Sequence, residues 1–579
     1  MNSPTFSPES PGADVDAWAA RGFSSEGGAC HAKIAALSAA VMPAAEPLPT
    51  VTYVSKGNVL VIGDGPLAAR AATELARALP VTLLVSSNPA GLDTAPESLA
   101  VWKGKVESAS GYLGQFTFEL AGLTGLRGMA PAASGSGAAQ AAIVDLVVDA
   151  GAEPLFAQHQ PPQGYWRLAD DAALEKVLAE IPQAVGEFEK PKFFAYRANL
   201  CAHSRSTITG CNRCVEVCST RAIAADGDHV KVDPHLCMGC GACASVCPSG
   251  AMSFLFPRVA DRGDHLRSLL SAFRAAGGKD ACVLFHNGTD GRELLASAAA
   301  AGKGLPARVI PIEAWHVASL GIDLFLGALA LGANQVAVLA AGSEAPEYRV
   351  SLTEQLALAQ QIVAALGYVG QHFKLVEVGD AQSLASALAD LGSATGPAAP
   401  AAFALSNDKR MAVEFAVEHL AKHAPTKTEQ IALEAGAPWG EVKVDKEKCT
   451  LCLACAGACP ASALMDGGEA PQLRFLERNC VQCGLCVKTC PENALALSPR
   501  LLLTAAVREA RVINETQPFH CVRCNKPFGT KQMVDAMVGR LSGHAMFSGG
   551  AALRRLQMCA DCRVVDMMSN PNEMTTRDL

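Results

Sequence analysis

The sequence predicts a chain of several α/β and α+β domains, and three observations support this fold class. Short apolar strands alternate with helical stretches in two regions, residues 57–190 and 257–400. Two pairs of closely spaced cysteine runs follow these regions and hold sixteen of the 22 cysteines. Two further Cys-x-x-Cys pairs lie near the carboxyl terminus. At 579 residues, the chain is long enough to hold this many domains.

Residues 1–56 are rich in Ser, Pro, Ala and Gly, which predicts an irregular amino-terminal segment. They contain no basic stretch followed by an apolar core and no paired arginines, so we expect a cytoplasmic protein. Clustered cysteines in that compartment usually hold metal. The most apolar window, residues 320–341, is interrupted by polar residues, so no transmembrane span is expected. The net charge of -8, with no basic run among aromatics, argues against a nucleic-acid partner.

Residues 57–190 are predicted to form a Rossmann-like domain. The segment NVLVIGDGPLAARAATELARALPVTLLVSS reads as a buried strand, a glycine turn, an amphipathic helix and a second strand. Gly63, Gly65 and Ala68 form a GxGxxA variant, in which the glycines allow a pyrophosphate to approach the start of the helix. These three residues are therefore the candidate positions for FAD or NAD.

Other residues of the same segment argue against a bound dinucleotide. Pro66 stiffens the turn, and Asp64 places a negative charge where the phosphates would lie. The second strand ends in Ser86 and Ser87, where an acidic residue would normally meet the ribose. We therefore interpret this region as a degenerate dinucleotide fold, and a bound flavin or nicotinamide stays open as the alternative.

The cysteine runs define two modules, residues 191–256 and 441–500. Three of the four runs match CxxCxxCxxxCP at every position, and the fourth has nine residues in its first gap and ends in Ser219. The members of the first pair are Cys201, Cys211, Cys214, Cys218 and then Cys237, Cys240, Cys243, Cys247. The members of the second pair are Cys449, Cys452, Cys455, Cys459 and then Cys480, Cys483, Cys486, Cys490.

This spacing predicts four 4Fe-4S clusters. Three thiolates from a tight loop bind three irons of a cubane, and in two-cluster ferredoxins the last cysteine of the run binds the other cluster. Cys201, Cys211 and Cys214 would then share a cluster with Cys247, and Cys237, Cys240 and Cys243 would share one with Cys218. By the same rule, Cys449, Cys452 and Cys455 pair with Cys490, and Cys480, Cys483 and Cys486 pair with Cys459.

The alternative for these runs is zinc knuckles or disulfides. A zinc ribbon, however, binds its metal with two Cys-x-x-Cys pairs and does not require a third and fourth cysteine at these spacings. An internal repeat supports two related ferredoxin modules. Val-Lys-Val-Asp precedes one run at 230–233 and another at 442–445.

The remaining segments are assigned from pattern and composition. Residues 257–400 contain four strand-like runs, ACVLFHN, ARVIPIE, NQVAVLAA and HFKLVEV, which predict a second α/β domain with a mostly parallel sheet. Residues 401–440 are predicted to form a helical connector. Residues 501–579 are predicted to form a zinc-ribbon-like domain with one zinc on Cys521, Cys524, Cys559 and Cys562, and with a helix inserted near 529–541. Iron of the rubredoxin type and a further cluster are the alternatives for this metal.

The order of these parts resembles the heterodisulfide reductase A-like iron-sulfur proteins. The likeness rests on VLVIGDGPLAARAA, on GYLGQFTFEL at 111–120 and on the ferredoxin module that follows. Residues 281–391 look like the delta subunit of methyl-viologen-reducing hydrogenase, but the strand ends HNG, IEAW and AAGSEA lack the thiols of its 2Fe-2S cluster. Chains with two such modules also resemble the iron-sulfur proteins associated with bacterial molybdenum or tungsten formate dehydrogenases.

Three functions follow as hypotheses. The first is a non-catalytic electron-transfer subunit, which relays electrons between a dehydrogenase, such as a molybdopterin formate dehydrogenase, and a second redox partner. The second is a flavin- or NAD-dependent oxidoreductase subunit. The third is an assembly factor for a metalloenzyme, with the carboxyl-terminal metal domain as its interaction module. The first is favoured because every strong motif is a cluster ligand set and none is a catalytic acid, base or nucleophile.

Overall fold

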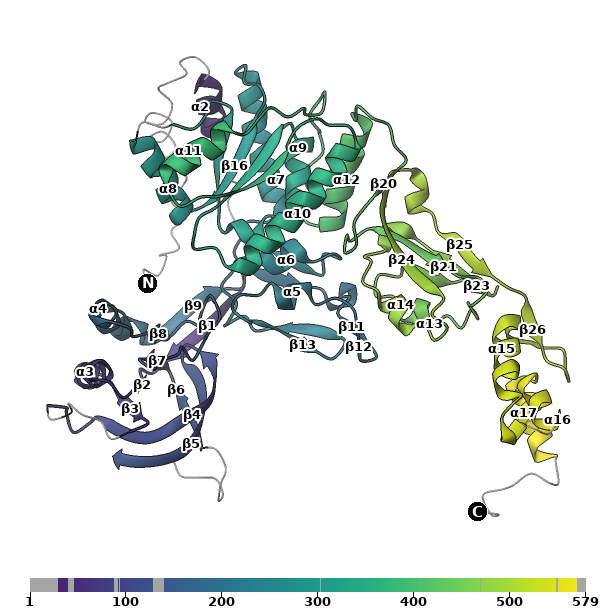
Figure 1. The fold of residues 1–579 in the computed structure, drawn as a ribbon, viewed down its shortest axis with the longest axis horizontal. Helices are drawn as coiled ribbons and strands as arrows, with labels where there is room; N and C mark the ends of the chain where they lie inside the picture. Colours follow the sequence, from purple (N-terminus) through teal and green to yellow (C-terminus); the bar gives the residue numbers. More distant parts are fainter. Residues whose placement is uncertain are drawn as a thin grey trace.

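The computed structural model describes residues 30–39, 46–87, 92, 94–128, 140–301, 304–468, 470–547 and 550–569. Figure 1 shows two sheets in the first two thirds of the chain, with the first cysteine module between them. The second module and the carboxyl-terminal helices extend away from these sheets.

The first sheet has seven strands and begins with the predicted strand, turn, helix and strand. Its spatial order is β6 (Gln140–Val144), β5 (Gln115–Arg127), β4 (Ala100–Tyr112), β3 (Val81–Val85), β2 (Val59–Ile62), β7 (Leu146–Asp149) and β8 (Tyr165–Arg167). The strands from β4 to β8 in this order are parallel, and β5 and β6 add antiparallel to the edge. Helix α3 (Pro66–Leu75) connects β2 to β3, and α4 (Asp171–Glu180) packs beside it.

The segment at 111–120 covers the end of β4, a two-residue turn and the start of β5, and these two long strands curl away from the other parallel strands (Figure 1). Gly114 lies in this turn with a φ of +85°, and a Cβ there would come within 2.1 Å of the carbonyl oxygen of Val54. Glycine is therefore required where the turn packs against the preceding strand.

The expectation of an irregular segment over residues 1–56 is wrong for two parts of it. Helix α2 (Cys30–Ala39) packs on α7 (Val259–Ala275) through buried Ala32 and Ala36. The Lys33 Nζ donates hydrogen bonds of 3.1 and 2.7 Å to the carbonyl oxygens of Leu305 and Pro306. Strand β1 (Thr50–Ser55) pairs with β9 (Gly186–Pro191). Composition missed both elements because distant parts of the chain bury them.

The second sheet consists of the four predicted strands, all parallel, in the order β17 (Val309–Ala314), β16 (Cys282–Asn287), β18 (Gln335–Ala340) and β19 (Phe373–Glu377). One face packs on α7, α9 (Ile322–Ala330) and α10 (Pro346–Ala365). The other face packs on α8 (Asp290–Ala300) and α11 (Ala381–Ala389). The apolar runs of the sequence are explained by this burial on both faces.

Residues 401–440 were expected to form a helical connector, but their helix α12 (Lys409–Lys422) is part of the second α/β domain. It packs along α9, and its residues Val413, Ala416 and Leu420 belong to the same core as the second sheet. The segment at 401–440 thus completes the α/β domain, because the apolar face of α12 is buried there.

Each cysteine module has a short pairing of strands and two short helices. In the first, β10 (Phe194–Tyr196) pairs with β15 (Met252–Phe254) and β13 (Ile223–Asp226) pairs with β14 (His229–Val232), beside α5 (Arg213–Glu216) and α6 (Ala242–Val246). In the second, β21 (Gly440–Val444) and β20 (Gln430–Ala432) pair with β24 (Leu495–Leu502), beside α13 (Ala454–Gly457) and α14 (Leu485–Thr489). A sheet of β22 (Leu464–Asp466), β23 (Gln472–Phe475) and β25 (Arg511–Glu515) completes it.

The long first gap of the run at Cys201 is an ordered hairpin. Its strands are β11 (Ser204–Arg205) and β12 (Ile208–Thr209), and Ser206 and Thr207 turn the chain with positive φ angles of 49° and 69°.

The carboxyl-terminal region has one hairpin, β26 (Pro518–His520) with β27 (Pro527–Thr530), followed by α15 (Lys531–Leu541), α16 (Gly550–Leu556) and α17 (Ala560–Met568). Helix α15 confirms the helix predicted near 529–541. The second Cys-x-x-Cys lies at the start of α17 and not in a second hairpin. Among the described residues, no helix combines the length and apolar character needed to cross a membrane.

Candidate metal centres

The structure brings the sixteen cysteines of the two modules together in four groups, which we name by number. Site 1 is Cys201, Cys211, Cys214 and Cys247, and site 2 is Cys218, Cys237, Cys240 and Cys243. Site 3 is Cys449, Cys452, Cys455 and Cys490, and site 4 is Cys459, Cys480, Cys483 and Cys486. In each group the fourth member comes from the other run of the pair, as the neighbours of the thiols and two small cavities of the second module indicate.

In the first module, the groups are recognised from the cysteines whose charges raise the pKa of each buried thiol. Burial raises the pKa of the Cys214 thiol to about 12, and the charges that add to the increase are those of Cys247, Cys211 and Cys201. Burial likewise raises the pKa of Cys240 to about 12, with further increases from Cys218 and Cys237.

The second module repeats this pattern. Burial raises the pKa of Cys455 to about 12, and the neighbours that add to it are Cys449, Cys452 and Cys490. Burial raises the pKa of Cys483 to about 11, helped by Cys459 and Cys480. The members of site 3 and of site 4 each line a small cavity of their own.

This arrangement fits iron-sulfur clusters. The buried thiols whose pKa is raised, such as Cys214, Cys240 and Cys455, resist ionisation unless positive charge lies beside them, and thiolates are the form that binds metal. Backbone N–H groups also point at the sulfurs. Met252 donates to the Cys247 Sγ at 3.4 Å, and Ala463 and Ala494 donate to Cys459 and Cys490 at 3.3 Å each. Such hydrogen bonds stabilise the negative charge of a bound cluster.

Two side chains from outside the module reach site 2. The hydroxyl of Tyr348, on α10, donates to the Cys240 sulfur and is itself hydrogen-bonded to the Ser219 hydroxyl. The ammonium group of Lys190, on β9, donates to the carbonyl oxygens of Cys237 at 2.9 Å and of His235 at 2.6 Å. Both side chains are buried, and the sequence gives no local signal for either role.

Two cations of α12, Lys409 and Arg410, lie near sites 1 and 4. The Lys409 Nζ donates to the carbonyl oxygens of Ala244, at 3.1 Å, and of Ser245 in the first module. The Arg410 guanidinium donates to the carbonyl oxygens of Pro248, at 3.3 Å, and Cys480, at 3.2 Å. It therefore connects the first module to the second.

The residues proposed for a dinucleotide do not fit one. The Asp64 carboxylate accepts hydrogen bonds from the backbone N–H groups of Ser86, at 2.7 Å, and Ser87, at 2.9 Å, and from both hydroxyls. Although slight burial opposes ionisation, these hydrogen bonds lower the pKa of Asp64. An ionised carboxylate therefore lies across the turn, where it repels a pyrophosphate.

The other residues of the turn do not offset this repulsion of a pyrophosphate. Gly63 has a φ of +147°, and a Cβ there would meet Ala150 at 3.0 Å, so this glycine serves the packing of the strand ends. Gly65 precedes α3 with open space around it, Pro66 removes one of the N–H groups at the helix start, and Ala68 is buried within the core. The three candidate positions thus serve the fold.

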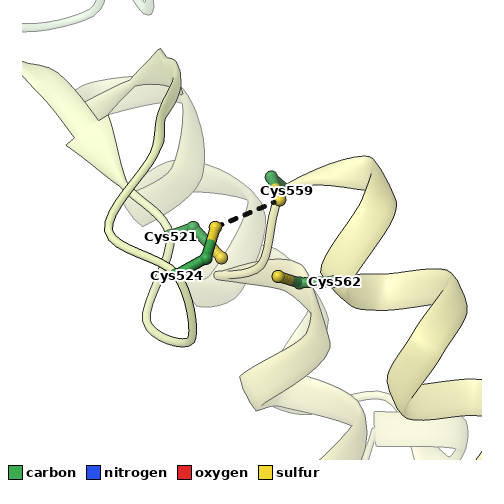
Figure 2. A group of neighbouring side chains, drawn as sticks. All are labelled: Cys521, Cys524, Cys559 and Cys562. Atoms are coloured by element: carbon green, nitrogen blue, oxygen red, sulfur yellow. Dashed lines mark hydrogen bonds between the residues drawn. The ribbon is translucent and has the colours of Figure 1, made fainter.

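The carboxyl-terminal cysteines form a compact group. Figure 2 shows Cys521 and Cys524 on the loop after β26, facing Cys559 and Cys562 at the start of α17. The four sulfurs lie within 4.8 Å of one another, and those of Cys524 and Cys559 are 3.7 Å apart. A tetrahedral ion with metal–sulfur bonds of about 2.3 Å places its sulfurs about 3.8 Å apart. This geometry fits a single metal ion better than a cubane, whose four irons hold the thiolates farther apart.

The environment of Cys521 also favours a thiolate. Burial opposes its ionisation, but hydrogen bonds from the backbone N–H groups of Cys524, Cys559 and Arg523 lower the pKa of this thiol to about 6. At neutral pH, the Cys521 thiol is therefore mostly ionised, which is the form that binds a metal ion.

Comparison with known proteins supports the two modules. Residues 209–251 and 448–495 each match a family described as the 4Fe-4S dicluster domain. A stretch of 60 residues is 47% identical to the isethionate sulfite-lyase activating enzyme of Oleidesulfovibrio alaskensis, covering 10% of this chain and 18% of that protein. A stretch of 39 residues is 46% identical to a protein named Ferredoxin 7Fe from Hydrogenibacillus schlegelii, covering 7% of this chain and 50% of that protein.

The chain thus spans half or less of the length of each of these relatives. The two dicluster regions are identified by the family matches at 209–251 and 448–495. Two regions of the chain therefore match 4Fe-4S dicluster domains, and these matches support the binding of iron-sulfur clusters there.

Proposed function

We propose that the protein relays electrons through four 4Fe-4S clusters, one at each of sites 1 to 4, between a dehydrogenase and a second redox partner. The observation that carries this proposal is the grouping of sixteen thiols, fifteen of them buried or half-buried, into four sets, with backbone N–H groups directed at three of the sulfurs. Each cluster accepts and releases one electron at a time, and the protein supplies the ligands, the hydrogen bonds and the surrounding charge.

Site 3 is the place where we expect a partner to dock. Of the sixteen cysteines of sites 1 to 4, all within the described residues, Cys452 alone is exposed. The carboxyl-terminal domain lies beside this site, since the Thr530 hydroxyl donates to the carbonyl oxygen of Thr450 at 2.7 Å. That domain exposes a set of apolar side chains: Met546, Val564, Val565, Met567 and Met568. A redox protein that covers this surface would bring its own centre close to site 3.

The dehydrogenase in this proposal is a molybdopterin formate dehydrogenase, which is supported by the resemblance in the order of domains. An anaerobic pull-down of the tagged protein from its host, with iron, sulfide, molybdenum, tungsten, zinc and flavin measured on the retained proteins, tests it. A retained molybdopterin enzyme with flavin-free bait supports the relay. A solitary protein with stoichiometric flavin contradicts it and favours the oxidoreductase hypothesis.

The exposed apolar set also favours a second candidate, an assembly factor that binds an apoenzyme through the carboxyl-terminal domain. The two functions differ when electrons are supplied artificially. A dehydrogenase made without this protein retains its activity with an artificial acceptor if the protein is a relay, and lacks that activity if the protein is needed for maturation.

A further inference from the structure

The hairpin in the long first gap of the run at Cys201 joins the two cysteine modules. Its last strand, β12, ends at Thr209, whose carbonyl oxygen accepts a hydrogen bond of 2.6 Å from the Nζ of Lys488 on α14. Gly210 follows, and a Cβ at this position would lie 2.8 Å from the Cγ of Leu485. The hairpin therefore rests directly on the helix that carries Cys486.

These contacts lie between a ligand of site 1 and the ligands of site 4. Gly210 immediately precedes Cys211, and Leu485 stands between Cys483 and Cys486. Strand β12 and helix α14 pack against each other at this contact.

Arg410 also connects site 1 to site 4. One guanidinium donates to Pro248, next to the site 1 ligand Cys247, and to the carbonyl oxygen of the site 4 ligand Cys480. Sites 1 and 4 are thus held together by two separate sets of contacts.

The outer sites follow from the crossing of ligands. Site 2 adjoins site 1, since α5, which carries Cys214, packs on α6, which carries Cys243. Site 3 adjoins site 4, since α13, which carries Cys455, packs on α14, which carries Cys486. The neighbours therefore run 2, 1, 4, 3, which differs from their order in the chain.

We propose that the four clusters form one continuous electron path in the order site 2, site 1, site 4, site 3, and that the hairpin at 204–209 is the element that joins its halves. The proposal rests on the proposed function. In each step a reduced cluster loses one electron, its oxidised neighbour gains it, and no bond forms or breaks. A reduced redox protein supplies the electron at one end and an oxidised one removes it at the other.

The test uses the full-length holoprotein, reduced with dithionite, and electron paramagnetic resonance of the magnetic coupling between modules. In Cys483→Ser, which removes a ligand of site 4, we expect the coupling of site 1 to the second module to be lost. In Cys452→Ser, which removes a ligand of site 3, we expect it to remain. Equal effects of the two substitutions, or the reverse pattern, would overturn the order.

A second variant keeps every ligand in place. The double substitution Leu485→Ala with Lys488→Met removes the two side chains of α14 that contact the hairpin, and we expect a weaker coupling between modules. The matched control, Lys443→Met, removes an exposed lysine of the same module and leaves the coupling unchanged. An unaltered coupling in the double variant overturns the role of the hairpin.

Iron and sulfide are measured on every sample. Fewer than four clusters in the native protein contradict the proposed function itself, whereas four clusters with the wrong coupling pattern contradict only the path.

Discussion

The buried ammonium group of Lys190 lies 2.9 Å from the carbonyl oxygen of Cys237, a ligand of site 2. Its hydrogen bonds to the Tyr53 hydroxyl and to His235 fix it there, between the strand pair β1 and β9 and the first cysteine module. A positive charge held in a buried position favours the more negative, reduced form of a neighbouring cluster.

Replacing Lys190 with Met is therefore expected to lower the reduction potential of site 2. A redox titration followed by electron paramagnetic resonance measures this, with Lys192→Met as a control for the same change of charge two residues away. Equal shifts in the two variants would show that the position of Lys190 next to Cys237 has no special effect.

Replacing Tyr348 with Phe is expected to lower the potential of the same cluster, because it removes the hydroxyl that donates to the Cys240 sulfur. The same titration checks the result. Tyr368→Phe serves as control, since the Tyr368 hydroxyl donates to the carbonyl oxygen of Leu420, far from any ligand in sequence. A change of site 2 potential in the control alone contradicts the assignment.

The crossing of ligands predicts opposite effects of two substitutions in one module. Cys459→Ala is expected to impair the cluster at site 4 and leave site 3 nearly intact, and Cys490→Ala is expected to do the reverse. Iron content together with the spectra of the reduced clusters distinguishes the two. If each substitution removes the cluster of its own run, the ligand assignment is wrong.

Several features of the fold and of these sites could be predicted from sequence because the signal is local. The cysteine spacing predicts the ligand sets, and the apolar runs near 281–287 and 334–341 predict buried parallel strands, which are β16 and β18 in the structure. Lys190 and Tyr348 could not be found this way. Each reaches its site across an interface between segments that are distant in sequence, and a single lysine or tyrosine carries no pattern. The helix α2 was missed for the same reason, since α7 buries it.

The dinucleotide motif shows the converse case. Gly63, Gly65 and Ala68 have the right spacing, but the structure turns Asp64 onto Ser86 and Ser87, and these are the residues that argued against a ligand in the sequence. A match to a short glycine motif therefore identified the strand, turn and helix correctly without identifying a binding site.

The carboxyl-terminal cysteines are expected to bind one zinc ion. Cys524→Ser should lose the zinc and unfold the region of α15 to α17, because a structural zinc contributes about 10 kcal/mol or more to a small domain. Metal analysis and hydrogen exchange measure this, and Cys282→Ala, which changes a buried cysteine of β16, should leave the zinc in place. A protein with iron at this site instead of zinc contradicts the expectation.

Acid should destabilise the second α/β domain through His265. Burial lowers the pKa of His265 on α7 from 6.5 to about 4, so below pH 6.5 the unfolded chain takes up a proton that the folded domain does not. Stability contributed by this group is full above pH 6.5 and falls as the pH is lowered toward 4, by about 2 kcal/mol at pH 5.

Hydrogen exchange of the peptides of α7 at pH 7 and pH 5 checks this. His265→Leu is expected to reduce the difference between the two pH values, and the exposed His520→Leu is expected to leave it unchanged. An unchanged pH dependence in His265→Leu contradicts the account.

The central claim is that one chain holds four 4Fe-4S clusters, and counting iron and acid-labile sulfide in the anaerobically purified protein tests it most directly. The account predicts about four irons and four sulfides for each of the four sites, all in one polypeptide. Half this content, or iron without matching sulfide, would contradict a relay that runs through both modules.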